Sequence, residues 1–330
     1  GLRLAFLITA HRSPPESVKA LLRRLHSPAH LFLVHFDRRA PAAKRELDAF
    51  VRAANLSGTV STFSEVDVVQ GGSGLLRASV LGMRRLVAMA RARPREEGWR
   101  YLVRLSEHDY PVSSAEALSE HLGLHDGLSF VPMDGCHRSA CARPLGTACG
   151  GEAYTFAGAL GMHKPRRHWM RFARGPEWVA LTWDFVLYVL QGLRERGSIV
   201  RLIWQDALLL YQPDETFFQT AILNSPFCHL YVDRALHYIP PLERERKRHG
   251  RLDEIGTRSP EILRRATLTG LARARREQGA RFFARKFPDA SEPEAAELRR
   301  GLDEAFARRR RRPRGERGGA WPGLEAWLAA

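Results

Sequence analysis

The chain has 330 residues, of which 44% are hydrophobic and 27% charged, so it can bury one large core or two smaller ones. Its formal net charge of +16 favours a polyanionic partner or an anionic substrate such as a nucleotide-sugar, although many arginines are also typical of a GC-rich genome. No apolar run reaches the roughly 18 residues of a membrane span, and the lack of zinc-finger spacing, RNP-like aromatic boxes and heptads argues against nucleic-acid binding.

Strand-like and helix-like segments alternate in the first third of the chain. The apolar pattern predicts strands at residues 2–9, 30–35, 59–63 and 100–105. Helices are expected between them, beginning at Pro14, at Pro41 and after the glycine-rich turn at residues 71–74. This alternation predicts a mostly parallel α/β sheet covered by helices on both faces.

Polar residues or glycines follow several of these predicted strands. His11, Asp37, the turn at residues 70–72 and Asp109 lie at or just after strand ends. Parallel sheets bind ligands at the carboxyl ends of their strands, so the group favours a nucleotide-type crevice. Taken singly, each has a structural alternative: Asp37 and Asp109 also suit turns, and His11 suits a satisfied strand end.

Residues 127–161 are rich in glycine and are expected to form a long loop with one strand at 128–132. They contain Cys136, Cys141 and Cys149, three of the four cysteines. No CxxC pair is present, which argues against a zinc site, whereas disulfides remain an alternative whose pairing the spacing does not define. The glycosylation sequon that begins at Asn55 fits the secretory compartment in which disulfides form.

The stretch at residues 212–228, QPDETFFQTAILNSPFC, predicts a short helix. Asp214 and Glu215 fall in its first turn, where the helix dipole favours carboxylates. Phe217, Phe218, Ala221 and Ile222 form an apolar stripe at helical spacing. The pattern fits either a buried helix with an acidic start or a catalytic carboxylate on a rigid element.

The composition changes after Pro240, where the chain becomes charged and rich in arginine. An aromatic-basic run at residues 280–287 interrupts this part, and the arginines at residues 308–312 predict a solvated, partly disordered tail. Before the change, residues 185–193 are a predicted helix, and residues 230–232 and 236–239 are predicted short strands. We therefore expect a catalytic domain at 1–240 and a basic, largely helical extension at 241–330.

Six motifs in this order resemble glycosyltransferase family 14, the core-2/I-branching enzymes, and within it the peptide O-xylosyltransferases. The resemblance spans most of residues 4–287, and the motifs that begin at residues 213 and 282 are the most specific. The motifs lie at residues 34–37 (VHFD), 71–76 (GGSGLL), 105–111 (LSEHDYP), 175–178 (GPEW), 213–218 with 224–228 (PDETFF and NSPFC), and 282–287 (FFARKF).

This resemblance implies a GT-A type nucleotide-sugar-binding fold, inversion at the sugar carbon and no metal ion or other cofactor. It implies that Glu215 is the catalytic base, because Glu215 occupies the glutamate position of the Pro-x-Glu-x-Phe-Phe motif. The residues that would contact the nucleotide-sugar by the same transfer are Thr9, Asp37, Val68, Val69, Gln70, Glu177, Trp178, Ser259, Arg285 and Lys286.

The sequence departs from the xylosyltransferases at three features. Gln70 replaces their tryptophan, Glu177 replaces their aspartate, and only Cys228 of their cysteine framework has a match. Two of these changes fall at predicted donor contacts, so the donor sugar stays open. UDP-xylose, transferred to a hydroxyl such as that of a protein serine, is the leading expectation. UDP-GlcNAc, for a β-1,6-N-acetylglucosaminyltransferase, and UDP-glucuronic acid are the alternatives.

The expected chemistry agrees with the charged residues that are present. The sequence contains no Asp-x-Asp pair of the kind that holds a metal ion on the diphosphate in many such enzymes. Arg285 and Lys286 are cations that suit phosphate oxygens instead, unless they are merely a solvated basic pair. Trp178 can pack on a sugar or belong to the core.

A different class of function is an inactive polyanion-binding protein that keeps the fold. The presence of both Glu215 and the Arg285–Lys286 pair argues against it, because a pure binder has no need of both. The predicted partners are a UDP-sugar donor and a protein or glycan acceptor, without nucleic acid. The predicted location is the Golgi or another secretory lumen. Since the chain begins at Gly1 directly before a strand, a type II membrane anchor is expected to lie outside this sequence.

Overall fold

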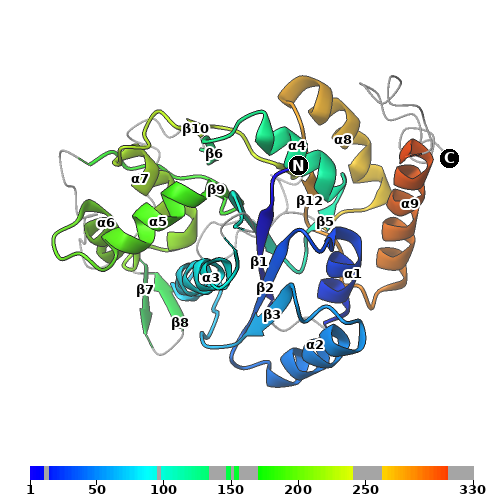
Figure 1. Cartoon of the computed structure of the whole chain (residues 1–330), viewed down its shortest axis with the longest axis horizontal. Coiled ribbons are helices and arrows are strands. Elements are labelled where there is room, and N and C mark those ends of the chain that lie inside the picture. Colours follow the sequence, from blue (N-terminus) through cyan, green and yellow to red (C-terminus); the bar gives the residue numbers. More distant parts are fainter. Residues whose placement is uncertain are drawn as a thin grey trace. The chain divides into compact units, whose positions relative to one another are not determined.

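The computed structural model describes residues 1–10, 15–94, 98–133, 146–149, 152–155, 170–240 and 262–310. The chain divides into two compact units. Figure 1 labels their helices and strands and colours them by residue number. Unit 1 comprises Gly1–Arg12, Ser27–Ser106 and Ser119–Ala235, and unit 2 comprises Ser13–His26, Glu107–Leu118 and Leu236–Ala330. The domain boundary expected at residue 240 stays a prediction.

A seven-stranded sheet forms the centre of unit 1, in the order β10-β6-β9-β4-β1-β2-β3. The pairs β4–β1, β1–β2, β2–β3 and β10–β6 are parallel, and β9 is antiparallel to β4 and β6. The mostly parallel α/β sheet predicted from the alternating segments is therefore confirmed. The strands are β1 (Leu4–Ala10), β2 (Leu31–Phe36), β3 (Val60–Phe63), β4 (Tyr101–Ser106), β6 (Ser129–Phe130), β9 (Ala180–Thr182) and β10 (Tyr231–Val232).

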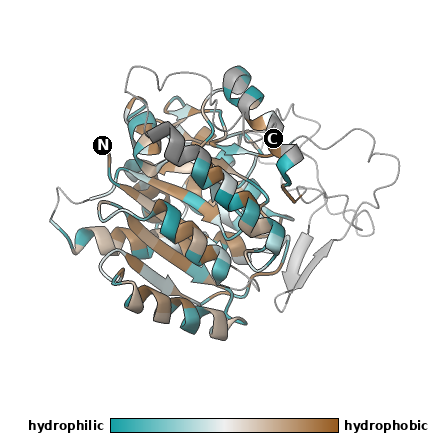
Figure 2. Cartoon of the chain, turned by 90° about the vertical axis from the view of Figure 1, so that its right-hand side faces the viewer, coloured by the Kyte–Doolittle hydropathy of each residue, from teal (hydrophilic) through white to brown (hydrophobic). Residues whose placement is uncertain are grey.

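Every residue of β1, β2 and β4 is buried. Strands covered on both faces have near-continuous apolar runs instead of an alternating pattern, which is why these segments were recognisable in the sequence. Figure 2 shows the sheet strands mainly in brown, the colour of hydrophobic residues. The central strands thus hold the loops at their carboxyl ends on a rigid core.

The helices of unit 1 pack on this sheet and on one another. In α3, Gly82 lies so close to β1 that a Cβ atom there would be 2.5 Å from a methyl carbon of Leu7. The helices are α2 (Pro41–Ala53), α3 (Gly74–Arg91), α5 (Trp183–Gly192), α6 (Ile199–Ala207), the 3-10 turn η2 (Pro213–Glu215) and α7 (Phe217–Leu223). The division between the units falls inside α4 (Ala115–Gly123).

Two local predictions differ from the structure, and two helices were not predicted. The stretch after Gln212 is not one helix, because Thr216 (φ −129°, ψ −35°) separates η2 from α7. The long loop predicted after residue 127 contains an antiparallel hairpin, β7 (Gly146–Cys149) with β8 (Glu152–Thr155). Strands of four residues beside glycines carry little periodic signal. Helices α4 and α6 were not predicted.

Unit 2 has its own small sheet and core. Strand β12 (Phe283–Ala284) lies between β11 (His237–Tyr238), which is parallel to it, and β5 (Tyr110–Pro111), which is antiparallel. The helices are α1 (Glu16–Leu25), α8 (Arg265–Gln278) and α9 (Pro293–Arg310). The aromatic residues of the run at 282–287 are buried in this unit. The arginine run expected to be a tail begins inside α9, and its last two residues lie outside the described part.

Candidate active site

The turn η2, which carries Glu215, is held by a hydrogen bond between the residue before it, Gln212, and the glycine turn at residues 70–72. Gln212 has a left-handed backbone (φ 52°, ψ 60°), and its N–H donates to the carbonyl oxygen of Gly71 at 2.9 Å. A Cβ atom at Gly71 would lie 2.0 Å from the ring of Tyr211, and the φ of Gly71 is +77°. Only glycine fits this contact. The glycine turn therefore supports η2 directly.

Helix α7 holds the segment at residues 171–176 by side-chain hydrogen bonds to its backbone. Thr220 Oγ1 accepts from the Ala173 N–H at 3.2 Å and donates to the Ala173 carbonyl oxygen at 3.1 Å. Asn224, one turn later, accepts from the Arg171 N–H at 2.9 Å and donates to the Arg171 carbonyl oxygen at 2.8 Å. Thr220 and the C-cap residue Asn224, which are four positions apart, thus bind the backbone of two residues that are two positions apart.

This segment places Arg174 against Glu215. Arg174 Nε donates to Glu215 Oε2 at 3.0 Å, and an Nη2 hydrogen bond and ion pair join the same two side chains. Arg174 Nη2 also donates to Gln212 Oε1 at 3.1 Å. The N–H of Gly175 donates to the Glu215 carbonyl oxygen at 2.9 Å. The predicted catalytic carboxylate is therefore fixed by both its side chain and its backbone.

A second carboxylate, Asp214, lies beside Glu215 in a different environment. Asp214 is 4% exposed, whereas the Glu215 side chain is 24% exposed. Burial raises the pKa of Asp214 well above its usual range, and the negative charges of Glu177 and Glu215 raise it further against the opposing charge of Arg104. Adjacent acids with such different surroundings are typical of sites where one carboxyl keeps its proton and the other is ionised.

Glu177 is held by a buried arginine. Arg104, on β4, donates to Glu177 Oε2 at 3.0 Å and to the Glu177 carbonyl oxygen at 3.2 Å. Its guanidinium carbon lies 5.7 Å from the centre of the Phe218 ring in α7. Arg104 therefore connects the GPEW motif to the PDETFF motif. The sequence singled out both motifs but not this arginine.

Most of the predicted donor contacts of unit 1 lie at one edge of its sheet. Thr9 pairs with His35 and Ser106 near the carboxyl ends of β1, β2 and β4, and the Asp37 N–H donates to the Ala10 carbonyl oxygen at 2.9 Å. Glu177 and Trp178 reach the same edge, because β9 runs antiparallel to β4. The structure thus brings Thr9, Asp37, Glu177 and Trp178 to the edge that the strand pattern indicated.

Asp37 holds in place the loop that carries three other predicted donor contacts, Val68, Val69 and Gln70. Its carboxylate accepts from Arg39 Nε at 3.0 Å, from Arg39 Nη2 at 2.7 Å and from the Val68 N–H at 3.1 Å. Burial raises the pKa of Asp37, but the hydrogen bonds from Arg39 and Val68 outweigh burial and lower the pKa to about 2. Along this loop Val68 is buried, Val69 is half-buried and Gln70 is exposed. Val69 and Gln70 are therefore accessible to a ligand.

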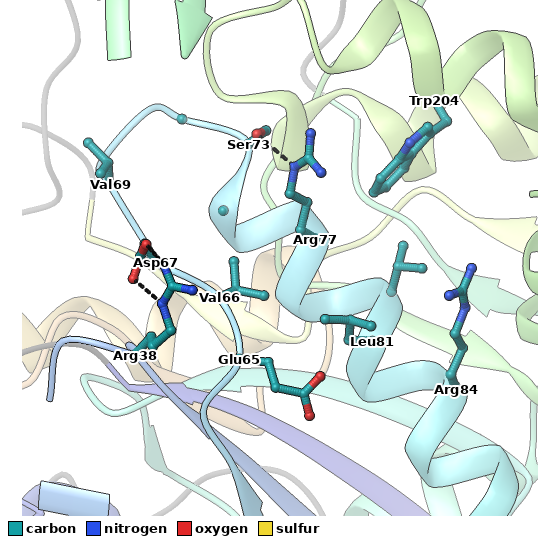
Figure 3. Close-up of a pocket in the computed structure, with 13 residues that line it drawn as sticks. Arg38, Glu65, Val66, Asp67, Val69, Ser73, Arg77, Leu81, Arg84 and Trp204 are labelled. Carbon is teal, nitrogen blue, oxygen red and sulfur yellow. Dashed lines mark hydrogen bonds and ion pairs between the residues drawn. The ribbon is translucent and has the colours of Figure 1, made fainter. Parts of the chain in front are cut away.

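A groove of about 490 Å³ lies beside the same loop (Figure 3). Figure 3 shows Arg38 and Asp67 on one side of it and Trp204 and Arg84 on the other, with Arg77 projecting from α3 between them. Arg38 Nε donates to Asp67 Oδ1 at 3.0 Å, so these two charges neutralise each other. Arg77 and Arg84 add positive charge, and Trp204 adds an aromatic face, which suits an anionic ligand.

The basic run in unit 2 is held by the predicted SEHDYP motif. Ala284 of β12 pairs with Tyr110 of β5, and the Phe287 N–H donates to the His108 carbonyl oxygen at 2.8 Å. This register brings Arg285 Nη1 to 3.1 Å from Asp109 Oδ1. The Asp109 side chain is 0% exposed and that of Arg285 is 14% exposed. Asp109, for which the sequence left a turn role or a ligand contact open, therefore forms an ion pair with a predicted phosphate-binding residue.

Lys286 lies in a partly buried position in the same unit. Burial lowers the pKa of its ammonium group, the charge of Arg285 lowers it further, and the charge of Glu107 opposes both. Its carbonyl oxygen accepts from the Leu263 N–H at 2.6 Å. The two predicted cations are thus each accompanied by a carboxylate of the SEHDYP motif.

Other predicted features have a more limited outcome. Ser259 lies outside the described residues, as do Cys136, Cys141 and His11. Cys228 is a free, half-buried thiol, so the proposed disulfides stay a prediction. In the parts of the chain that the structure describes, no group of three or more His, Cys, Asp or Glu side chains is placed to hold a metal ion. None of the described helices is long and apolar enough to cross a membrane.

Comparison with known protein families gives one match over most of the chain. The model of the Core-2/I-Branching enzyme family matches residues 4–263. The chain belongs to the core-2/I-branching enzyme family. The family resemblance and the α/β glycosyltransferase fold that it implied are confirmed, because the match covers both the sheet of unit 1 and the PDETFF motif. The motif at residues 282–287 lies outside the matched residues.

The curated relatives of this core-2/I-branching family member include several xylosyltransferases. Xylosyltransferase oxt of Drosophila pseudoobscura pseudoobscura is 29% identical over 240 residues, which are 72% of this chain and 26% of that protein. Xylosyltransferase oxt of Drosophila melanogaster is 28% identical over 238 residues, and Xylosyltransferase 2 of Canis lupus familiaris is 25% identical over 246 residues. The matched region spans about a quarter of the length of these relatives.

Proposed function

We propose that this protein is an inverting glycosyltransferase that transfers a sugar from a UDP-sugar to an acceptor hydroxyl without a metal ion. Glu215 is the catalytic base. The observation that carries this proposal is the pair of adjacent acids in η2: Asp214 is buried, whereas Glu215 is partly exposed and bonded to Arg174. A base has to be ionised and accessible before the acceptor binds, and the partial exposure of Glu215 together with its ion pair to Arg174 supports this role.

The proposed step is a single in-line displacement. The acceptor oxygen forms a bond to the anomeric carbon while Glu215 takes its proton, and the bond from that carbon to the diphosphate oxygen breaks. UDP leaves with the electron pair, and the configuration at the sugar carbon inverts. A fixed carboxylate contributes both orientation and proton transfer to such a step. The hydrogen bonds of Gln212 to Gly71 and of Gly175 to the Glu215 carbonyl oxygen support that fixed geometry.

Arg285 and Lys286 take the charge of the departing diphosphate in this proposal. Fixed cations with low exposure bind phosphate oxygens more strongly than solvated ones, since less water competes with them. The ion pair with Asp109 and the proximity of Lys286 to Glu107 support a fixed arrangement within unit 2. The sequence also lacks an Asp-x-Asp pair.

UDP-xylose is the leading donor, because the named relatives are xylosyltransferases. Gln70 and Glu177, which depart from those relatives, keep UDP-GlcNAc and UDP-glucuronic acid as alternatives. The proposed acceptor is a protein serine or a glycan hydroxyl. We place the reaction in the Golgi or another secretory lumen, and the exposed position of Asn55 at a turn supports use of its sequon there.

The test combines donor binding with turnover. The purified protein and Glu215→Gln are incubated with UDP-xylose, UDP-GlcNAc or UDP-glucuronic acid, each with a serine peptide or an oligosaccharide, with and without EDTA. We expect Glu215→Gln to lower kcat by about 10²- to 10⁴-fold while thermal shifts show unchanged donor binding. Near-normal turnover in this variant would refute the base, and loss of wild-type turnover in EDTA would refute metal independence. Salt-sensitive heparin binding without any UDP-sugar affinity would support a polyanion-binding protein instead.

A further inference from the structure

The two acids of η2 are Asp214 and Glu215, and a negative charge on one disfavours ionisation of the other. A buried carboxyl beside another carboxylate is disfavoured as an anion. The pair and the nearby Glu177 therefore carry less negative charge at a given pH than the same carboxyl groups would carry in water. Asp214 has the more buried position of the two. An opposite charge at either acid decides which of them is ionised.

Arg174 supplies such a charge to Glu215, which among the described residues is the carboxylate that accepts its hydrogen bonds. Its Nε lies 3.0 Å from Glu215 Oε2, and its Nη2 is bonded both to that oxygen and to Gln212 Oε1. The two residues are 41 positions apart in the sequence. A guanidinium that holds a carboxylate by two N–H groups fixes both its charge and its direction.

The position of Arg174 is built by the fold and does not depend on one surface contact. The backbone on its N-terminal side is bonded at Ala173 to Thr220, and the next residue, Gly175, is bonded to the Glu215 carbonyl oxygen. Gln219 Nε2 adds a hydrogen bond to the Pro176 carbonyl oxygen at 2.9 Å. Helix α7 thus holds the arginine, and only Thr216 separates this helix from the acid that the arginine contacts.

We infer that Arg174 is a positioning residue that makes Glu215, and not Asp214, the ionised member of the pair and fixes the direction of its carboxylate. This inference rests on the proposed function for its catalytic consequence, whereas the ionisation itself is independent of catalysis. In the part of the chain that the structure describes, the charged groups that face the pair include Arg174 and Glu177 from the segment before β9 and Arg104 from β4. Helix α7 carries no ionisable side chain. The ionisable side chains of α3, which also contacts η2, are all arginines.

The consequence for activity has a definite sign. Without the cation, ionisation of Glu215 requires a higher pH, so the acid limb of the pH–rate profile moves upward. Arg174→Gln is expected to lower kcat about 10- to 100-fold near neutral pH, the range associated with small displacements of a catalytic group. Part of the loss is regained at high pH, and the KM for the donor stays near the wild-type value. Arg174→Lys keeps the charge but not the double contact, so it keeps the pH profile and regains only part of kcat.

The experiment has one arm that needs no turnover. The carboxyl ¹³C signal of Glu215 is assigned by its absence in Glu215→Gln and is titrated in the wild type, Arg174→Gln, Arg174→Lys and the control Arg171→Gln. Arg171 is the matched control, because its side chain is exposed and only its backbone contacts Asn224. We expect the titration midpoint to rise in Arg174→Gln and to stay at the wild-type value in Arg174→Lys and Arg171→Gln.

An unchanged midpoint in Arg174→Gln, with cooperative unfolding retained, would overturn the inference, as would an equal shift in Arg171→Gln. The second arm records kcat and donor KM against pH for the same variants. If the midpoint moves but Glu215→Gln keeps normal turnover, the inference about ionisation holds and the proposed function fails. If the midpoint stays while Glu215→Gln is inactive, the proposed base holds and Arg174 has no positioning role.

Discussion

In each unit a charged side chain is held by a residue of opposite charge that is distant in the sequence, but this partner residue is attached differently in the two units. In unit 1, Glu215 at the end of a three-residue turn is held by Arg174, 41 residues away in the sequence. In unit 2, Arg285 after a two-residue strand is held by Asp109, 176 residues away. Elements this short have too few hydrogen bonds of their own to hold a side chain rigidly. A distant residue of opposite charge provides the constraint in both cases.

The difference lies in what holds the partner. Asp109 has no exposed side-chain surface and belongs to a segment paired with β12, so it contributes to the core of unit 2 as well as to Arg285. Arg174 lies in an irregular segment that is attached by side chains of α7. Substitution of Asp109 is therefore expected to affect folding and ligand binding together. Substitution of Arg174 is expected to change the charge beside Glu215 with little change in the free energy of unfolding.

The largest expected effect is at the cation itself. Arg285→Gln removes one of the two charges assigned to the diphosphate and is expected to lower kcat/KM about 10²- to 10³-fold, as loss of a charge-stabilising group does in other enzymes. Turnover with the best donor measures this. The exposed Arg273 on α8 provides the control, since Arg273→Gln removes the same charge from unit 2 and should leave turnover near the wild-type value. Equal losses in both variants would indicate a general charge effect.

The second largest effect is expected at Asp109, the buried partner of Arg285. Asp109→Asn leaves Arg285 with little solvent and no carboxylate at this position, so the free energy of unfolding should fall by about 3 kcal/mol. Denaturant titration measures the loss. The double variant with Arg285→Gln should lose less than the sum of the two single losses, because each substitution removes the same pair. Strict additivity would show that the ion pair contributes nothing.

A smaller effect is expected at the attachment of the Arg174 segment. Thr220→Val removes both hydrogen bonds to Ala173 and should lower the free energy of unfolding by about 1–2 kcal/mol. It should also lower kcat, because Arg174 loses its support. Thr220→Ser keeps the hydroxyl and serves as the control. A kcat loss in the serine variant as large as in the valine variant would mean that packing, and not the hydrogen bonds, holds the segment.

The smallest effect concerns the ion pair of Asp37 and Arg39, in which the Asp37 side chain is 0% exposed and that of Arg39 is 42% exposed. The folded-state pKa of Asp37 is lowered to about 2 from 3.8, so its contribution to stability is complete above the unfolded value and disappears as the pH falls through the folded value. Arg39→Gln should therefore lower the free energy of unfolding slightly above pH 4, and this loss should shrink towards pH 2. Unfolding measured across this pH range tests the sign, and a cost that grows in acid would contradict it.

The sequence by itself determined the alternation of strands and helices, because buried parallel strands leave apolar runs of their own. It also determined the motifs that carry Glu215, Glu177, Asp109 and the Arg285–Lys286 pair. The short strands of the hairpin after residue 145 and the break at Thr216 left no comparable pattern, since their conformation follows from neighbours outside the local window.

Only the tertiary structure decided which charges meet. Arg174 stands in the sequence as one arginine among many, and for Asp109 the sequence left a turn role and a ligand contact open. Their contacts with Glu215 and Arg285 depend on chain segments far away, attached by the Thr220 and Asn224 side chains in one unit and by the pairing of β5 with β12 in the other. A local pattern reports burial and periodicity, whereas ion pairs across long separations arise only when the chain has folded.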